Sequence, residues 1–230
     1  GLSGVAGSAY TITYSATGLN PVTETLTPTP GNAAQLALTT QASGGRTGSV
    51  FTVQPMLELR DSAGNLVSTD NATQVTMTAS NDARILGTAT SIANAGVMEF
   101  TGLGLLGIPN VPITLTFAAT GVTAATQSIT LQEGLALTPT FTVATRTEDG
   151  FELSISNYSP LFAWTVTGTN SASVSISKTG KITVTNLQPG ISSALTISAQ
   201  RPYFATGSAT ATGSALDAGV EAMLALGTSS

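Results

Sequence analysis

The stretch Gly104–Thr130, GLLGIPNVPITLTFAATGVTAATQSIT, occurs twice in this chain, because Gly1–Thr27 reads GLSGVAGSAYTITYSATGLNPVTETLT. The two stretches align without a gap at a constant offset of 103 residues. In the numbering of the first copy, the identical positions are Gly1, Leu2, Gly4, Thr11, Thr13, Ala16, Thr17, Gly18, Thr23 and Thr27. A repeat at a fixed spacing predicts an array of similar units. We therefore expect the chain to open inside a repeat unit, of which it holds only the last two strands.

The first copy has the pattern of a β-hairpin followed by a linker. Tyr10–Ala16 alternates between apolar and hydroxyl side chains, and Val22–Leu26 alternates again after a turn that contains Gly18. Alternation of this kind predicts strands with one buried face. The next residues, Thr27–Asn32, include two prolines, which favour an extended backbone and cannot donate a hydrogen bond. We expect a stiff linker here.

Hydroxyl side chains take the place that charges have in most soluble proteins. Charged residues make up 8 % of the chain, against about 25 % in an ordinary soluble domain. The sequence contains 40 Thr and 24 Ser, which can hydrate a surface without charge. Thr is also β-branched and therefore favours strands. The composition predicts an all-β protein.

Charge and cysteine content exclude several classes of partner and site. The net charge is −5 and the seven Lys and Arg residues are scattered, so no basic surface is available for nucleic acid. The absence of Cys excludes disulfides and thiolate metal sites. No run of about eighteen apolar residues occurs, so we predict no membrane span.

We predict tandem immunoglobulin-like β-sandwiches joined by short linkers, with a partial unit at the N-terminus, because turn signals recur between short alternating runs. Four parts are expected: residues 1–28, the last two strands of a unit or a strand-donating segment; 29–131, a first complete domain; 132–216, a second domain of immunoglobulin-like or fibronectin-III-like type; and 217–230, a tail. The tail has helical spacing at Asp217–Leu226, but it is equally compatible with the start of another unit or with disorder.

Strands and turns can be placed within the two complete domains. In the first, strands are expected at Gln35–Thr40, Val50–Arg60 with Pro55 as a bulge or edge position, Leu66–Thr69, Gln74–Ser80, Gly96–Thr101, Pro112–Ala119 and Ala124–Leu131. In the second, they are expected at Thr140–Arg146, Phe151–Ser156, Phe162–Thr167, Ser173–Ser177, Lys181–Thr185, Ala194–Ala199 and Gly207–Ala211. Turns are expected at Asp61–Asn65, Asn94–Gly96, Glu148–Gly150 and Lys178–Gly180, and the last two should place their glycine at positive φ.

Several of these segments resemble the tandem immunoglobulin-like repeats of large bacterial cell-surface proteins of the invasin and adhesin type. The resemblance is carried by Pro55–Asn65 (PMLELRDSAGN), Thr69–Thr73, Gly102–Leu103, Ile113–Gly121, Phe151–Thr167 and Lys181–Gly190. It covers most of residues 1–216 and implies display outside the cell, stalk building, adhesion or self-assembly. Repeats of this kind share no active site, so the resemblance transfers no functional residues.

The residues available for chemistry point away from catalysis. Without His or Cys, the chain cannot hold a serine-protease-type triad, a Cys–His nucleophile or a histidine metal site. A glycosidase needs two carboxyl groups facing each other, and the twelve Asp and Glu residues are scattered along the sequence. We predict that the protein is not an enzyme.

Calcium is the one cofactor that the sequence suggests. Hard oxygen ligands lie near loop ends at Asp61, Asn65, Asp70, Asn71 and Asp82. Their spacing matches no EF-hand loop, and Asp and Asn are also good turn formers. A calcium site and simple turn formation therefore remain as alternatives, and no other cofactor is expected.

We expect a non-catalytic extracellular structural protein that builds a stalk, fibre or surface layer of a bacterial cell. One alternative is a self-assembling filament or pilus subunit, in which residues 1–27 dock on a neighbouring copy. Another is an adhesin module that binds a surface glycan or protein. Tyr158, Phe162, Tyr203 and Phe204 would then form a sugar-stacking platform, whereas packing in the core or between domains is the alternative for these aromatics. The expected partners are copies of this chain or adjacent domains of the same chain.

Overall fold

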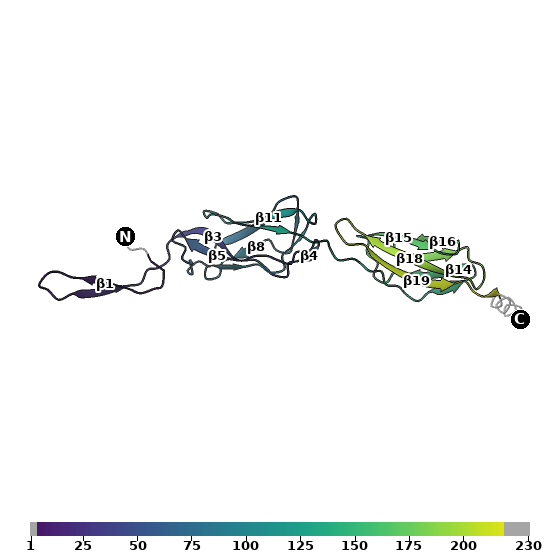
Figure 1. Ribbon diagram of the computed structural model, residues 1–230, viewed down its shortest axis with the longest axis horizontal. Coiled ribbons are helices and arrows are strands. Elements are labelled where there is room, and N and C mark those ends of the chain that lie inside the picture. Colours follow the sequence, from purple (N-terminus) through teal and green to yellow (C-terminus); the bar gives the residue numbers. More distant parts are fainter. Residues whose placement is uncertain (1–3, 219–230) are drawn as a thin grey trace. The chain divides into compact units, whose positions relative to one another are not determined.

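The computed structural model describes residues 4–218 and confirms the all-β prediction, with strands arranged around two separate cores (Figure 1). The chain divides into two compact units, Gly1–Glu133 and Gly134–Ser230. The domain boundary expected after residue 131 lies two residues before this division.

Three antiparallel sheets form the sandwich of the first unit. One contains, in order, β12 (Ala125–Thr130), β11 (Pro112–Ala118), β6 (Gln74–Ala79) and β8 (Thr90–Ile92). The second contains β3 (Ala33–Thr40), β5 (Met56–Asp61) and β9 (Val97–Glu99), and the third contains β4 (Ser49–Val50), β10 (Gly104–Leu106) and β7 (Arg84–Leu86).

The core of this sandwich follows from the alternation in its strands. In β11, Ile113, Leu115 and Phe117 are buried, while Thr114 between them is exposed. Full burial of one such side chain stabilises the fold by about 1.5–3 kcal/mol. The ring of Phe117 meets Phe100 edge to face, with the ring centroids 5.5 Å apart.

A buried glutamine side chain completes this core where the backbone does not pair. Gln127 on β12 is 8 % exposed, and its Oε1 accepts a hydrogen bond from Ala42 N at 2.9 Å. Its Nε2 donates to Ala42 O at 2.6 Å. The carboxamide therefore satisfies both polar groups of one buried peptide segment, which an apolar side chain would leave unpaired.

The N-terminal hairpin repeats the β11–β12 hairpin in structure as well as in sequence. It consists of β1 (Tyr10–Tyr14) and β2 (Val22–Leu26). Adding 103 to both residue numbers of each cross-strand pair in this hairpin gives a pair that β11 and β12 also form. The two hairpins therefore have the same register.

Local backbone geometry is repeated too. Gly7 N donates to Pro28 O at 2.9 Å, and the corresponding residues of the second copy make the same bond, from Asn110 N to Leu131 O, at 2.9 Å. Gly7 and Asn110 both have positive φ, at 79° and 60°. The glycines in the two hairpin turns have φ of 82° and 80°. Sequence similarity at the offset of 103 thus reflects one conserved local fold.

Two antiparallel sheets form the sandwich of the second unit. The first contains, in order, β13 (Thr145–Thr147), β14 (Gly150–Ser154), β17 (Lys181–Thr185) and β16 (Ser173–Ile176). The second contains β15 (Ala163–Gly168), β18 (Ser192–Gln200) and β19 (Gly207–Ser214).

The second core is built from alternate residues of these strands. Leu195 and Ile197 on β18 and Phe151 on β14 are fully buried. Trp164 on β15 lies at the margin of this core and is only partly buried. Its ring stacks on Tyr158, with centroids 5.5 Å apart, and its Nε1 donates to a backbone carbonyl at 2.9 Å. The largest side chain of this sandwich thus closes the edge of the core.

Two predicted strands of the first unit differ from the structure. The strand expected at Val50–Arg60 is two strands, β4 and β5, because Pro55 cannot donate to a sheet and the chain turns before it. The side chain of Gln54 bonds there to backbone groups of Phe51 and Leu103 in place of a ladder. Leu66–Thr69 forms only a single bridge and a turn.

Turn predictions were correct except at one glycine. Gly64, Gly96 and Gly180 have positive φ, as expected in tight turns. Gly150 was predicted to need positive φ as well, and this was wrong, because it begins β14 with an ordinary strand conformation. A side chain at Gly150 would collide with Val184 O on the neighbouring strand. Close backbone approach is therefore the reason for glycine there.

Two linker residues, Gln132 and Gly134, are held by different units. Gln132 exchanges backbone hydrogen bonds with the first unit, through Gly45 O and Thr47 N, at 3.0 Å each. Gly134 does the same in the second unit, through Tyr203 O and Ala205 N, at 3.0 Å each. Only one residue separates these two anchoring points.

The predicted tail falls almost entirely outside the described residues, since residues 219–230 are not described. Its first residue, Asp217, lies 3.6 Å from Arg146 as an ion pair. Within residues 4–218, no helix has the length and apolar character that crossing a membrane requires.

Candidate functional site

The residues predicted to bind calcium begin with a turn at the end of β5. Asp61 is 4 % exposed, and its carboxylate accepts four hydrogen bonds. Ala63 N and Asn65 N donate to Oδ1 at 3.0 and 2.8 Å, while Gly31 N and Asn65 Nδ2 donate to Oδ2 at 2.8 and 3.1 Å. The carboxylate thus closes its own turn and also holds the linker that leads to β3.

Hydrogen bonds to the charged carboxylate shift its titration. The bond from the Gly31 N–H contributes most, followed by the Asn65 side chain, and together the bonds lower the pKa of Asp61 to about 2. Partial burial opposes this shift without cancelling it. Asp61 is therefore ionised through the ordinary pH range.

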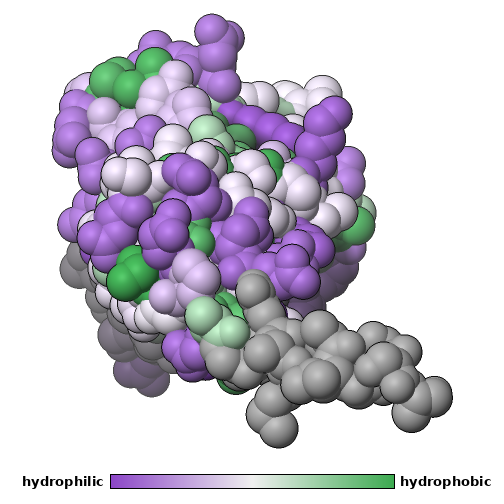
Figure 2. All heavy atoms as spheres, turned by 90° about the vertical axis from the view of Figure 1, so that its right-hand side faces the viewer, coloured by the Kyte–Doolittle hydropathy of each residue, from purple (hydrophilic) through white to green (hydrophobic). Residues whose placement is uncertain are grey.

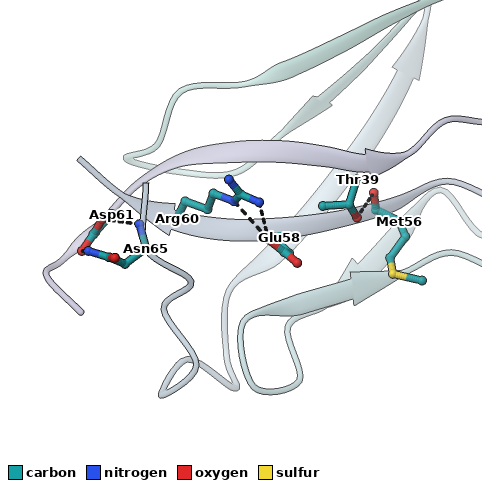
Figure 3. A network of polar contacts seen from close by, with 6 residues as sticks. All are labelled: Thr39, Met56, Glu58, Arg60, Asp61 and Asn65. Atoms are coloured by element: carbon teal, nitrogen blue, oxygen red, sulfur yellow. Dashed lines mark hydrogen bonds and ion pairs between the residues drawn. The ribbon is translucent and has the colours of Figure 1, made fainter. Parts of the chain in front are cut away.

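The same turn ties the N-terminal hairpin segment to the sandwich. Asn65 Oδ1 accepts a hydrogen bond from Ala6 N at 3.1 Å. Its Nδ2 donates to Asp61, and Figure 3 shows these two side chains next to each other. Two chain segments, one before β1 and one after β2, are thereby attached to the β5 turn through Asn65 and Asp61. The Asp-Ser-Ala-Gly-Asn sequence signalled the turn, but it gave no signal for these two longer-range bonds.

A groove of about 680 Å³ lies at this joint. Val5, Pro28 and Leu66 contribute apolar surface, and the ion pair of Arg60 with Glu58 lies along β5, with an N–O distance of 2.8 Å. Figure 3 shows Arg60 and Glu58 paired beside the Asp61–Asn65 bond. Its lining also includes the hydroxyl residues Thr27, Thr29, Ser68 and Thr69, and its one cation, Arg60, is paired with Glu58.

The second predicted pair of calcium ligands lies in the loop before β6. Asp70 accepts hydrogen bonds from Ala72 N, Thr73 N and the Thr73 hydroxyl at 3.1, 2.9 and 2.9 Å. These bonds, with the Thr73 N–H first, lower the pKa of Asp70. Asn71 Oδ1 accepts from Ala95 N at 2.8 Å. Asp70 thus closes the loop before β6, and Asn71 joins this loop to Ala95.

The fifth predicted ligand is separated from the other four. Asp82 is exposed in a turn with φ of 52°, at the end of β6 opposite to Asp70 and Asn71. No three Asp or Glu residues gather into a metal-holding group within the described part of the chain. The structure thus pairs Asp61 with Asn65, keeps Asp70 and Asn71 in a neighbouring loop, and leaves Asp82 apart. Calcium binding stays a prediction.

The four aromatic residues considered for glycan binding also separate. Tyr158 packs against Trp164 and the second core. Phe162 and Phe204 meet edge to face, with centroids 5.8 Å apart, and the Arg201 guanidinium lies 4.3 Å from the Phe204 centroid. Tyr203 is 47 % exposed. Half-buried rings that pack on each other and on an arginine offer little flat surface to a sugar.

The largest difference between the two hairpin copies lies in what covers them. In the second copy, Leu115 and Phe117 are fully buried. Their counterparts are Ile12, which is half-buried, and Tyr14, which is 56 % exposed. Within residues 4–218, β1 pairs with β2 alone. The sequence repeat was the signal that located this surface.

No family model and no curated protein sequence matches the chain. Among solved structures, it is similar to a glycosyl hydrolase family 2 member from Bacteroides cellulosilyticus, with 18 % identity and a TM-score of 0.39, covering 56 % of this chain and 18 % of that one. It is also similar to a Parabacteroides merdae β-glucuronidase, with 13 % identity and a TM-score of 0.32, covering 48 % and 15 %. A third is Drosophila N-cadherin EC1-4, with 12 % identity and a TM-score of 0.25, covering 86 % and 52 %.

The chain spans no more than about half the length of any of these three proteins. At this level of similarity, the function of none of them extends to this chain.

Proposed function

We propose that the chain is a non-catalytic structural protein: a stretch of a serial array of immunoglobulin-like sandwiches that builds a stalk, fibre or surface layer outside a bacterial cell. The observation that carries this proposal is the repeated hairpin. The same register, the same closing hydrogen bond and the same positive-φ positions recur 103 residues apart. Repetition of one structural unit along a chain is the mark of an array whose role is extension.

The surface composition supports this role. Hydroxyl side chains alternate with buried ones along β11, β12 and β18, so the exposed faces of these strands are polar without charges. Figure 2 shows hydrophilic and near-neutral residues interspersed with small, separate hydrophobic ones on one face of the molecule. Such a surface is hydrated mainly by hydroxyl groups, without depending on charge.

The joints support it as well. The hairpin segment is attached to the first sandwich by bonds to Asp61 and Asn65, and the next linker has one residue between anchoring points on either side, at Gln132 and Gly134. Short anchored joints restrict the bending of an array. A spacer that holds a fixed length requires this property.

The stiffness of the joints can be measured by pulsed electron spin resonance. Because the chain contains no Cys, two introduced cysteines would carry the only spin labels. We would label Thr126→Cys with Thr167→Cys across the linker, and Thr25→Cys with Thr78→Cys across the first joint; all four side chains are exposed. A pair within one sandwich, Ser62→Cys with Thr126→Cys, would give the width due to the labels alone.

For a spacer, we expect distance distributions across the joints nearly as narrow as that of the control pair. Broad distributions, of the kind that a flexible tether gives, would contradict the proposal.

A second candidate function is a self-assembling filament subunit, favoured by the exposed apolar face of the N-terminal hairpin. In that case the hairpin of one chain would dock on another copy, and repeated head-to-tail contacts would form a fibre. Light scattering of the purified chain would then show growth with concentration. A single species at all concentrations would eliminate this candidate.

A further inference from the structure

We infer that the face of the N-terminal hairpin formed by Tyr10, Ile12, Tyr14, Val22 and Leu26 is a docking surface for the remaining strands of an immunoglobulin-like unit of the same repeat, equivalent to β3–β9 of the first sandwich. This inference rests on the serial array proposed above and deepens it by naming the partner of the hairpin.

Comparison of the exposed fractions of equivalent residues in the two copies shows that this face is uncovered. Val22 and Leu26 are 66 % and 40 % exposed, whereas their counterparts Ala125 and Ile129 are each 9 % exposed. Apolar side chains at equivalent register positions are therefore covered by other strands in the second copy and left uncovered in the first. An exposed apolar face on a two-stranded hairpin is unfavourable in water, which favours a partner.

The second copy of the repeat identifies what covers such a face. The outer edge of β11 pairs with β6, with Thr116 opposite Thr78 and Phe117 opposite Met77. The buried face of β11 packs into the core that contains Phe100. By equivalence, the edge at Ile12–Ser15 should receive a strand like β6, and the face should receive a core like that one.

The hairpin differs from its second copy at two positions on this face, and these differences indicate that its partner differs from the strands that cover the second copy. Glu24 stands where Gln127 stands in the second copy, and Tyr14 stands where Phe117 stands. The Tyr14 hydroxyl donates to Glu24 Oε2 at 3.2 Å. A carboxylate accepts hydrogen bonds but cannot donate one, so Glu24 cannot make the bond that Gln127 Nε2 gives to Ala42 O.

The partner of the hairpin should therefore present hydrogen-bond donors opposite Glu24, where the first sandwich presents the carbonyl of Ala42. The same argument disfavours a second copy of this chain as the occupant. In that copy β11 and β12 already fill the place, and the Ala42 carbonyl would lose its donor. We commit to a preceding unit of the array as the occupant.

A fusion protein tests this directly. Its junction follows the natural sequence, since Leu103 precedes Gly104 and Gly104 is the counterpart of Gly1. A copy of residues 32–103 would be joined in front of Gly1 of the full chain, which rebuilds the native order of a complete unit. Hydrogen exchange measured by mass spectrometry would follow the peptide that contains residues 12–15. We expect its exchange to slow by about tenfold or more relative to the unfused chain, because the outer edge of β1 becomes paired.

Two variants of the fusion keep the test decisive. Tyr14→Phe with Glu24→Gln restores the side chains of the second copy, and we expect it to protect the hairpin more than the parent fusion does, because the added strands carry the Ala42 carbonyl. Ile12→Asp in this variant should abolish the protection. Unchanged exchange of residues 12–15 in both the parent fusion and the double variant would overturn the inference.

A second copy as the occupant would show in the unfused chain. Sedimentation that reveals a concentration-dependent dimer, lost in Ile12→Asp, would overturn our choice of partner, and a monomer at all concentrations supports it. Failure here is separable from failure of the spacer role. The spin-label pair of Thr126 with Thr167 reports stiffness without involving the hairpin, so narrow distances with no hairpin protection would reject the docking surface alone.

Discussion

At the scale of single residues, a few polar side chains form hydrogen bonds with backbone groups that have no partner in a β-sheet. Asp61 bonds to the linker, Gln127 to Ala42, and Thr47 accepts from Gly107 N and donates to Gly107 O at 2.9 and 2.7 Å. Each lies where two segments meet without a ladder. Buried backbone groups must find a partner, and these side chains supply it.

The titration of Asp61 makes the first sandwich sensitive to acid. Its pKa is about 2 in the folded state and about 3.9 in the unfolded chain, so the unfolded state binds more protons between these values. The stabilising contribution is complete above about pH 4 and is lost as the pH falls toward about 2. We expect the thermal midpoint of the first unit to fall over this window, measured by calorimetry.

Asp61→Asn should lower the midpoint at pH 7 and flatten its dependence on pH in that window. Asp82→Asn makes the same change of charge in an exposed turn and should leave the midpoint at pH 7 unchanged. An unaltered acid slope in Asp61→Asn would show that the carboxylate is not the source.

Gln127 gives a second prediction at this scale. Gln127→Ala leaves Ala42 N and Ala42 O buried without partners, which should destabilise the first unit by about 1–3 kcal/mol. Thr126→Ala, on the exposed face of the same strand, should change the free energy of unfolding by less than about 0.5 kcal/mol. Urea denaturation of both variants compares their free energies of unfolding, and equal effects would contradict this role of Gln127.

At the scale of elements, long alternating strands could be predicted from the sequence and short irregular ones could not. β11, β12, β17 and β18 alternate over several residues, and their predicted positions agree with the structure within two residues at each end. The three-residue strands β7, β8 and β10 were not predicted, because three residues are too few to show an alternation of apolar and polar side chains. They are set by the partners that the fold brings to them.

The candidate site shows the same division. The sequence identified Asp61 and Asn65 as a turn, since Asp and Asn bond to backbone groups within a few residues. It could not reveal that Gly31 and Ala6 would be the distant donors, because those contacts depend on how the chain folds back. The alternation in the hairpin predicted strands with one buried face, and for Val22–Leu26 this was wrong, because no further strand covers this face within residues 4–218.

The repeat supplies a matched pair of mutations for the hairpins. Leu115→Ala removes a fully buried side chain and should cost the first unit about 2–5 kcal/mol. Ile12→Ala makes nearly the same change at the equivalent position of the N-terminal hairpin and should cost less than about 0.5 kcal/mol, because no core covers it. Urea denaturation followed by circular dichroism measures both. A large effect of Ile12→Ala would mean that this face is already packed.

At the scale of the whole molecule, two separate cores lead us to expect two unfolding events. The core of the first unit includes Leu115 and that of the second includes Ile182, and neither cluster shares a residue with the other. We expect Leu115→Ala to shift one calorimetric transition and Ile182→Ala to shift the other, each by several degrees. A common shift of both transitions in either variant would show that the units unfold together.

The anchored linker has a further consequence, for digestion. A protease must draw several residues of extended chain into its active site, and it usually finds them in exposed loops and tethers between domains. Here Gln132 is hydrogen-bonded to one unit and Gly134 to the next, so the segment between them cannot extend while both sets of hydrogen bonds are intact. Cutting the chain at this point would require one of the sandwiches to open first. The resistance of the linker to cleavage is thus set by the stability of the domains beside it.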